Sequence, residues 1–231
     1  MQNNFHYYYN NVPGKGLCRN NLIYTSMVNK DKTVFCKWYY NDTDYHLGMN
    51  VVDPELMNEK WTREKRFLTM MAEEYQQHVP RILDIDNDER KIFLEIDGPD
   101  LWELSSCGVY PYEKVLPDWR EQMLEIIQAH KDIGIYKYSM HPSSYFVVDG
   151  KLKSINYFFC YTDNDEEITL KSVLSHISDE RQQDLFPKMQ AAGIGLDQKT
   201  SFKEIQMLAF ESFKTNFDHD VMEEAKKIYA A

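Results

Sequence analysis

Residues 145–155 read YFVVDGKLKSI, two β-rich runs on either side of Asp149-Gly150. Asp-Gly is a strong signal for a two-residue hairpin turn, because both positions of that turn need positive φ. We therefore expect strands at 145–148 and 151–155. Ahead of them, residues 117–130 begin with Pro-Asp and repeat apolar side chains on one face, which predicts a helix.

The residues before this helix predict an antiparallel sheet with one helix inserted. Short β-rich runs flank polar turns at 29–32 and 87–89, and Asp53-Pro54 opens a long stretch with apolar residues at helical spacing. The expected elements are strands at 22–28 and 33–40, a helix at about 54–77, and strands at 81–86 and 91–96. Asp97-Gly98-Pro99 then breaks the pattern.

The C-terminal third predicts helices near 179–191, 201–214 and 218–230. Ser201 and Glu204 fit a capping box, in which each side chain bonds to the other residue's backbone N–H. The chain is therefore expected to be an α+β protein of two lobes. The first, at 1–97, is rich in strands, and the second, at 98–231, is mainly helical and carries the 145–155 hairpin.

The composition is that of a folded, acidic protein. Its 231 residues carry 26 basic and 37 acidic side chains, a formal net charge of −11. Binding phosphates needs clustered Lys and Arg, so we expect no nucleic-acid partner and no attachment to anionic membranes. No apolar run approaches the roughly 20 residues of a membrane helix, and the first residues lack a signal-peptide pattern. The dispersed cysteines and histidines form no metal set and favour reduced thiols in the cytoplasm.

The residues around the hairpin resemble a known family. Residues 133–147, IGIYKYSMHPSSYFV, resemble the catalytic loop G-I-x-H-G-D-L-H-P-G-N-x-L-V of phosphotransferases related to aminoglycoside and choline kinases. Residues 149–158, DGKLKSINYF, are similar to the hairpin that leads to the I-D-F-G metal motif of that family. The resemblance implies a bilobal protein-kinase-like fold, with an antiparallel-sheet N-lobe that holds one helix and a mainly helical C-lobe.

Further motifs of this family follow in the same order along residues 12–160. Gly14 and Gly16 of VPGKGL resemble its phosphate loop, Lys37 falls at its strand lysine, and Glu64 falls at the helix glutamate that pairs with that lysine. Residues 93–98, FLEIDG, resemble the hinge. The resemblance implies that a nucleotide would contact Lys37, Glu64, Gly14, Gly16, Glu95 and Ile96.

The residues that carry the family's chemistry are replaced. The catalytic Asp aligns with Ser139, the Asn five residues later with Ser144, and the metal-binding Asp with Asn156. A serine hydroxyl is no base near neutral pH, and neutral oxygens are poorer magnesium ligands than carboxylates. In addition, Lys137 replaces the loop histidine and Phe158 the last glycine.

These replacements predict a pseudokinase that acts as a binding or regulatory module for an unknown protein or small molecule. They are compatible with ATP as a ligand but do not require it, and they argue against bound magnesium. An alternative hypothesis is an active ATP-dependent phosphotransferase with atypical catalytic residues, acting on a small molecule or a protein. A third hypothesis is an unrelated α+β interaction protein, in which Lys37, Glu64 and Asn156 would not approach one another.

Simpler interpretations compete for single residues. Lys37 is equally explained as an exposed strand lysine, and Gly14-Lys15-Gly16 as a plain turn. His141 is better explained by a structural hydrogen bond than by catalysis. The acidic run at 163–167 matches no calcium loop and is better explained as a solvated loop.

Overall fold

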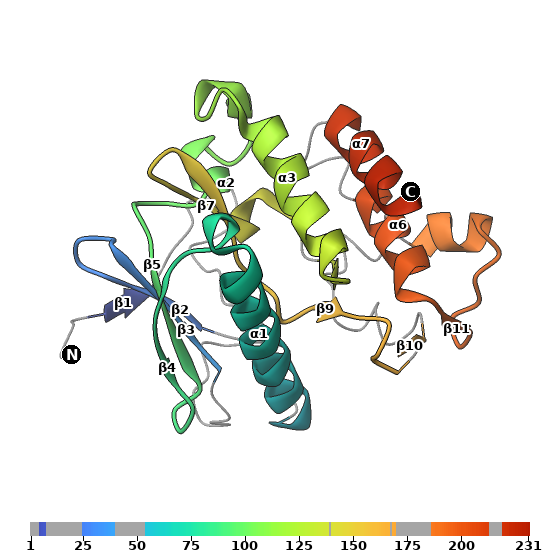
Figure 1. Cartoon of the computed structure of the whole chain (residues 1–231), viewed down its shortest axis with the longest axis horizontal. Helices are drawn as coiled ribbons and strands as arrows, with labels where there is room; N and C mark the ends of the chain where they lie inside the picture. The colour runs from blue at the N-terminus through green and yellow to red at the C-terminus, as the bar shows by residue number, and fades with distance from the viewer. Residues whose placement is uncertain are drawn as a thin grey trace. The chain divides into compact units, whose positions relative to one another are not determined.

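The computed structural model describes residues 5–7, 25–39, 54–138, 140–166, 168–169, 186–212 and 219–231 (Figure 1). It is a mixed α/β structure with an antiparallel sheet and helices, as expected from the sequence. By their own contacts its residues form two compact units, one of residues 1–122 and 142–159 and one of residues 123–141 and 160–231. We describe each unit by itself. The assignment of 1–97 and 98–231 to two lobes stays a prediction.

The largest sheet of the first unit has five strands in the order β1-β2-β3-β5-β4, all antiparallel. The strands are β1 (Phe5–Tyr7), β2 (Thr25–Asn29), β3 (Val34–Trp38), β4 (Ile82–Asp86) and β5 (Lys91–Glu95). The turn between β2 and β3 is fixed by the side chain of Asn29, whose Oδ1 accepts from the N–H groups of Thr33 and Val34, each at 2.8 Å. β3 lies in the middle of the sheet, and its central residues are buried.

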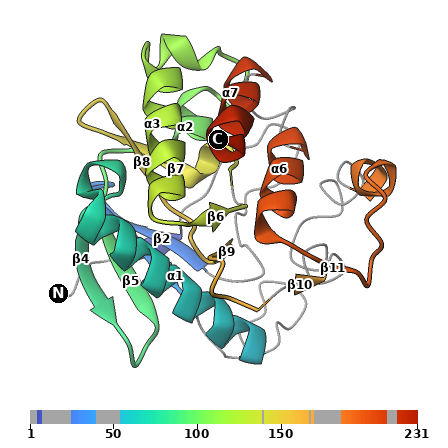
Figure 2. The ribbon, with the colours of Figure 1, turned by 45° about the vertical axis from the view of Figure 1, so that its right-hand side comes forward.

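Helix α1 (Pro54–Glu74) lies along one face of this sheet in both views (Figures 1 and 2). Proline at the first helical position is favourable because its missing N–H would have no partner there. The buried residues recur every three or four positions and are Met57, Lys60, Trp61, Glu64, Phe67, Leu68 and Met71. This face therefore includes two charged side chains, each with an exposed fraction of 0%.

The hairpin expected at 145–155 is formed by β7 (Tyr145–Val148) and β8 (Lys151–Ser154). Its turn residues Asp149 and Gly150 both have positive φ, 51° and 70°, as this turn requires. Gln122 fixes the hairpin, because its Oε1 accepts from Leu152 N at 2.8 Å and its Nε2 donates to Gly150 O at 3.2 Å.

Short elements complete the first unit. Helix α2 (Leu101–Leu104) is capped by the buried Asp100, whose carboxylate accepts from Glu103 N at 3.0 Å. Single turns of 3-10 helix follow α1, precede α3 and precede β7: η1 (Gln76–His78), η2 (Tyr112–Lys114) and η3 (Pro142–Ser144). Next to α2, Ser106, Cys107 and Gly108 all have positive φ.

Helix α3 (Trp119–Asp132) begins in the first unit and continues into the second. In the second unit β6 (Tyr136–Lys137) pairs with β9 (Cys160–Tyr161), and β10 (Ile168–Thr169) pairs with β11 (Lys199–Thr200). Residues 186–191 are helical, as are α6 (Phe202–Ser212) and α7 (His219–Ala230). The expected helix at 179–191 is thus described only from residue 186 onward.

Aromatic side chains form much of the core of the second unit. Tyr161 stacks on Phe202 at 4.7 Å between ring centroids, and Tyr136 lies against Phe202 and Tyr229. Tyr138 and Tyr229 donate their hydroxyls to the backbone carbonyls of Phe202 and Ile135, at 3.1 and 2.6 Å. Each buried tyrosine hydroxyl thus has a hydrogen-bond acceptor, as buried polar groups usually do.

The capping box expected before α6 is formed. Glu204 N donates to Ser201 Oγ at 3.2 Å, and Ser201 N donates to Glu204 Oε2 at 3.1 Å. Thr200 Oγ1 adds a further bond to the same carboxylate oxygen at 2.7 Å. These hydrogen bonds, that from Thr200 above all, hold the pKa of Glu204 below its usual value.

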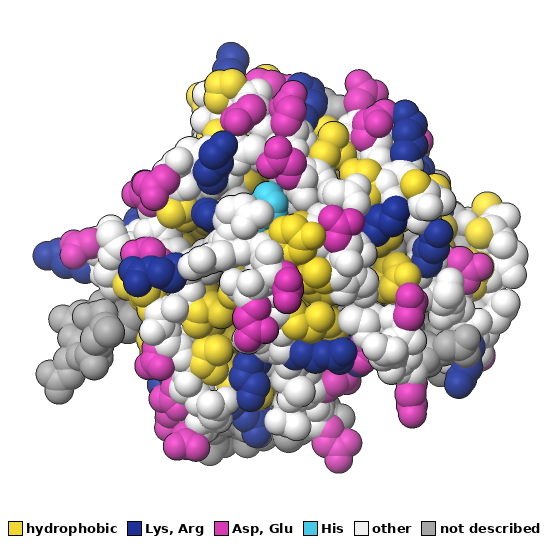
Figure 3. Space-filling model, in the orientation of Figure 1, with side chains coloured by type: hydrophobic (Ala, Val, Ile, Leu, Met, Phe, Trp, Pro, Cys, Tyr) yellow, Lys and Arg dark blue, Asp and Glu magenta, His cyan; other side chains and the backbone are white. Residues whose placement is uncertain are grey.

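Acidic and basic side chains are interspersed over the face drawn in Figure 3, with apolar side chains between them. Within the described part of the chain, no helix combines the length and the apolar character that crossing a bilayer requires.

Candidate functional site

The structure brings together Lys37, Glu64, Asn156 and Ser144, all in the first unit. Lys37 lies on the central strand β3 and Glu64 on the buried face of α1. Asn156 follows β8 by two residues, and Ser144 is the last residue of η3. Gly14, Gly16 and Ser139 lie outside the described residues.

Lys37 and Glu64 form an ion pair that is closed to solvent. Their Nζ and Oε1 atoms are 2.7 Å apart, and both side chains have an exposed fraction of 0%. Taking two charges out of water is costly, so such a pair persists only where further polar groups complete it.

Those further groups surround Glu64. Its second oxygen, Oε2, accepts from the backbone N–H of Phe158 at 2.7 Å and from the Tyr39 hydroxyl at 3.1 Å. The ammonium of Lys37 also lies 5.4 Å from the ring centroid of Phe158 and 5.7 Å from that of Tyr39, where aromatic faces favour a cation. The carboxylate therefore joins α1 to β3 and to the segment after β8.

Asn156 completes the network on the other side of Lys37. Its Oδ1 accepts from Lys37 Nζ at 3.0 Å, and its Nδ2 donates to Ser144 Oγ at 2.9 Å. Asn156 is 4% exposed and has a φ of 66°, a left-handed conformation that asparagine tolerates better than most residues. The buried amide is thus held at both ends by protein groups.

This donor set does not fit a pair of magnesium ions. Mg²⁺ is bound through carboxylates and phosphate oxygens, whereas Asn156 and Ser144 supply neutral oxygens that already accept hydrogen bonds from Lys37 and Asn156. The nearby carboxylate, Glu64, is committed to Lys37, Tyr39 and Phe158. Among the described residues, no group of three or more His, Cys, Asp or Glu side chains is placed to hold a metal.

The hinge residues proposed to contact a nucleotide have partners of their own. The Ile96 N–H donates to Thr33 O at 3.0 Å, and Ile96 is buried. The Glu95 carboxylate binds the Arg81 guanidinium through two hydrogen bonds of 2.8 and 2.7 Å. The Glu95 carboxylate and the Ile96 N–H are thus both hydrogen-bonded within the protein. Their role in nucleotide binding stays a prediction.

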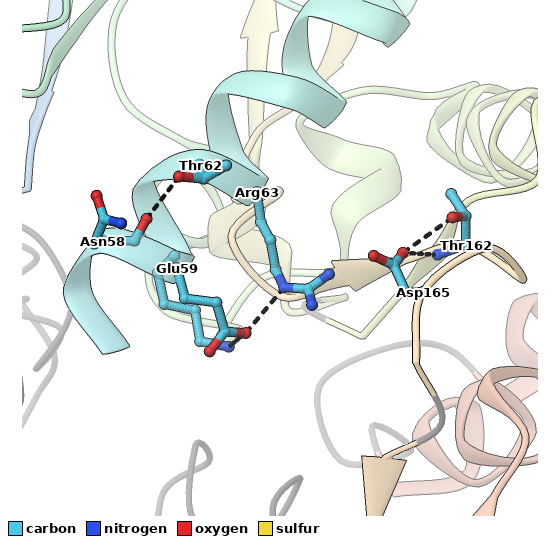
Figure 4. A network of polar contacts seen from close by, with 7 residues as sticks. Asn58, Glu59, Thr62, Arg63, Thr162 and Asp165 are labelled. Carbon is cyan, nitrogen blue, oxygen red and sulfur yellow. Dashed lines mark hydrogen bonds and ion pairs between the residues drawn. The ribbon is translucent and has the colours of Figure 1, made fainter. Parts of the chain in front are cut away.

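Two further regions named from the sequence belong to the second unit. Lys137 lies on β6 and is buried. In the acidic run, Asp163 accepts from the Tyr136 hydroxyl at 3.2 Å, and Asp165 accepts from Thr162 N and Oγ1 at 2.7 and 3.0 Å (Figure 4). Both carboxylates therefore already accept hydrogen bonds from other residues of the second unit.

The first turns of α1 carry a separate polar network (Figure 4). Arg63 Nε donates to Glu59 Oε1 at 3.0 Å, and Thr62 Oγ1 donates to Asn58 O at 2.9 Å. Burial raises the pKa of Glu59, but the charge of Lys60 and the hydrogen bond from Arg63 outweigh it and hold the pKa below its usual value. The network is built of residues within one helix and needs no ligand to explain it.

Sequence reasoning did not find two members of the site, Tyr39 and the Phe158 backbone. Tyr39 was part of an expected strand, where an aromatic residue needs no other explanation. Phe158 was noted only because it replaces a glycine, and a backbone N–H leaves no trace in a sequence pattern.

No family model matches this chain, and no curated protein matches it. Among solved structures it is similar to WbdD, described as a bifunctional kinase-methyltransferase, with 13% identity and a TM-score of 0.49 over 98% of this chain and 51% of that one. A 2.2 Å WbdD structure gives 12% identity and 0.46 over 90% and 48%. WbdD with the kinase inhibitor LY294002 also gives 12% and 0.46, over 89% and 44%. The chain thus spans about half the length of these structures, and all three TM-scores lie below 0.5.

Proposed function

We propose that this chain is a kinase-like protein without the usual catalytic and metal-binding residues, acting as a binding or regulatory module for a protein or a small molecule. The supporting observation is the contact between Lys37 Nζ and Asn156 Oδ1. By the sequence resemblance, Asn156 stands where the related kinases have a metal-binding Asp. The side chain that should hold a cation is instead neutral and bonded to the lysine.

The energetics of phosphoryl transfer support this interpretation. Catalysis depends on positive charge held against the phosphates and on carboxylates that hold the magnesium ions. Lys37 is fully buried between Glu64 and Asn156. A phosphate that approached the ammonium would compete with Asn156, whose amide also donates to Ser144. The site is therefore better suited to hold the fold together than to turn over a nucleotide.

A binding experiment tests this proposal. Thermal shifts are recorded with ATP in the presence and absence of magnesium, for the protein and for Asn156→Asp. We expect magnesium to leave any ATP shift of the unaltered chain unchanged, and to enlarge it only in Asn156→Asp, which restores a carboxylate. The matched control is Asn58→Asp, which adds the same charge on the exposed side of α1.

Magnesium-dependent phosphoryl transfer from ATP by the unaltered chain, lost in Lys37→Met, would contradict the proposal. A magnesium-enhanced ATP shift in the unaltered chain would contradict it as well. Nucleotide binding that does not respond to metal agrees with a nucleotide-binding pseudokinase, and absence of an ATP shift agrees with a binding module that uses another surface.

A second candidate function is an active ATP-dependent phosphotransferase with atypical catalytic groups. The observation that favours it is the Lys37–Glu64 ion pair at 2.7 Å, since active kinases need a pair of this kind in place. It predicts transfer of the γ-phosphate to a small hydroxyl compound or a protein. Radiolabelled ATP with magnesium or manganese, compared between the chain and its Glu64→Gln variant, distinguishes it from the first proposal.

A further inference from the structure

A groove of about 430 Å³ lies within the first unit, and neither Lys37 nor Glu64 lines it. Its lining comes from η1, the segment between η1 and β4, the last residue of β5, and the β7–β8 hairpin. The charged residues that line it are Arg81, Glu95, Asp149, Lys151 and Lys153. Three of these five are cationic, on a chain whose formal net charge is −11.

The charges that line the groove do not cancel. Glu95 and Arg81 neutralise each other, because two hydrogen bonds join them and the bonds from Arg81 lower the pKa of Glu95. The remaining lining charges are the two positive charges of Lys151 and Lys153 and the one negative charge of Asp149. Lys151 has a carboxylate within reach outside the lining, Asp118, but at 4.0 Å and with both side chains more than half exposed. The five charged lining residues thus leave one net positive charge.

Lys153 is held in the groove by a backbone acceptor. Its Nζ donates to Gln77 O at 2.7 Å, which uses one of the three N–H donors of the ammonium. Burial lowers the pKa of this ammonium, Lys151 lowers it further, and Asp149 opposes both. An anion placed between the two lysines would offset both unfavourable effects, since opposite charge stabilises the protonated form.

The rest of the lining suits a small organic molecule. The apolar lining residues are Val148, which is half-buried, and Val79 and Pro80, which are buried, and the volume falls in the range of about 300–1,000 Å³ that is usual for small-molecule sites. A single inorganic ion would leave most of this space unused. The exposed side-chain amides of Gln76 and Gln77 add neutral donors beside the lysines.

We propose that this groove binds a small anionic ligand, with its phosphate or carboxylate head between Lys151 and Lys153 and its apolar body against Val148. This inference is independent of the function proposed above, because it uses none of the residues around Lys37. Of the residues that the resemblance assigns to a nucleotide, the groove lining shares only Glu95, which is bonded to Arg81.

The test uses four probes: phenyl phosphate, benzoate, inorganic phosphate and benzyl alcohol. Binding to the full chain is followed by amide chemical shifts in ¹H–¹⁵N spectra. We expect saturable shifts at the groove residues with phenyl phosphate or benzoate, and weaker binding of inorganic phosphate and benzyl alcohol. The comparison of phenyl phosphate with benzoate identifies which head the lysines prefer. Affinity should fall as salt is raised, because the interaction is largely ionic.

Variants separate the lysines from the general charge of the protein. Lys153→Gln should weaken binding about tenfold, since a charge-assisted hydrogen bond is lost, and Lys151→Gln roughly threefold, as expected for a more exposed charge. Lys153→Arg should retain most of the affinity, because it keeps the positive charge and changes only the shape of the side chain. The matched control is Lys203→Gln, an exposed lysine on α6 outside the groove, which should bind as the unaltered chain does.

Three results would overturn the proposal. One is the absence of saturable shifts at the groove residues with both organic anions. Another is equal binding of benzyl alcohol, which would show that charge is irrelevant. The third is an affinity in Lys151→Gln and Lys153→Gln that equals that of Lys203→Gln, in protein whose circular dichroism is unchanged.

Discussion

Replacing Glu64 by Gln removes the negative charge from the buried site while keeping the shape of the side chain. In the structure this carboxylate meets Lys37 Nζ at 2.7 Å, Phe158 N at 2.7 Å and the Tyr39 hydroxyl at 3.1 Å. The glutamine amide has only one oxygen to offer these three donors. Its NH₂ group must then face a donor, and the ammonium of Lys37 remains buried without its counter-charge.

The expected cost follows from this geometry. Breaking a fully buried ion pair by removing one partner costs about 3–5 kcal/mol, because an uncompensated charge stays in the interior. Domains are stabilised by only about 5–15 kcal/mol, so Glu64→Gln should remove a large part of the free energy of unfolding. With a urea m-value of about 2–3 kcal/mol/M, the midpoint should fall by roughly 1.5 M.

Urea unfolding followed by far-UV circular dichroism measures the effect. The double variant Lys37→Met/Glu64→Gln should lose less stability than the sum of the two single variants, because it removes both charges together. The matched control is Glu73→Gln, which lies exposed on the same helix and should change the free energy of unfolding by less than about 0.5 kcal/mol. A loss below about 1 kcal/mol in Glu64→Gln, or single effects that simply add, would refute the reasoning.

Three other predictions concern stability. Gln122→Leu should cost about 1–3 kcal/mol of the free energy of unfolding, since it leaves the Leu152 N–H without its acceptor at 2.8 Å. Exchange of the Leu152 amide with D₂O should accelerate, and unchanged exchange would count against this prediction. Gly108→Ala should cost more than Gly150→Ala in urea, because both have positive φ but only at Gly108 would the new Cβ meet a ring, Trp102, at 2.7 Å; equal losses would contradict this. Glu204 has a lowered pKa in the folded chain, so its contribution to the free energy of unfolding is complete above its usual pKa of 4.5 and is lost as the pH falls through the lower folded pKa. Glu204→Gln should therefore flatten the acid side of a plot of stability against pH. An unchanged plot would show that the capping box does not titrate with folding.

Local patterns in the sequence were sufficient for most elements of the fold. The Asp149-Gly150 turn and the helical spacing after Pro54 placed β7, β8 and α1 to within a few residues, since each depends on near neighbours in the chain. The pairings β6–β9 and β10–β11 were not expected. Their strands have two residues each and join distant parts of the chain, so no periodicity marks them.

The candidate site could be anticipated only in part. Lys37, Glu64 and Asn156 were grouped because a family resemblance aligned them, and the structure does bring them together. The hypothesis of an unrelated protein in which these residues stay apart is wrong on that point. Their partners Tyr39 and Phe158 depend on the packing of α1 against β3 and the segment after β8, which local patterns do not encode.

The position of the tryptophans has a practical consequence for fluorescence spectroscopy. All four tryptophans, Trp38, Trp61, Trp102 and Trp119, fall in the first unit, whereas the second unit contains none. Trp61 also lies 5.8 Å from the ring of Tyr39. Indole emission excited near the red edge of tyrosine absorption therefore originates from the unit that holds the buried lysine. An emission change would assign an unfolding step to that unit without an attached dye.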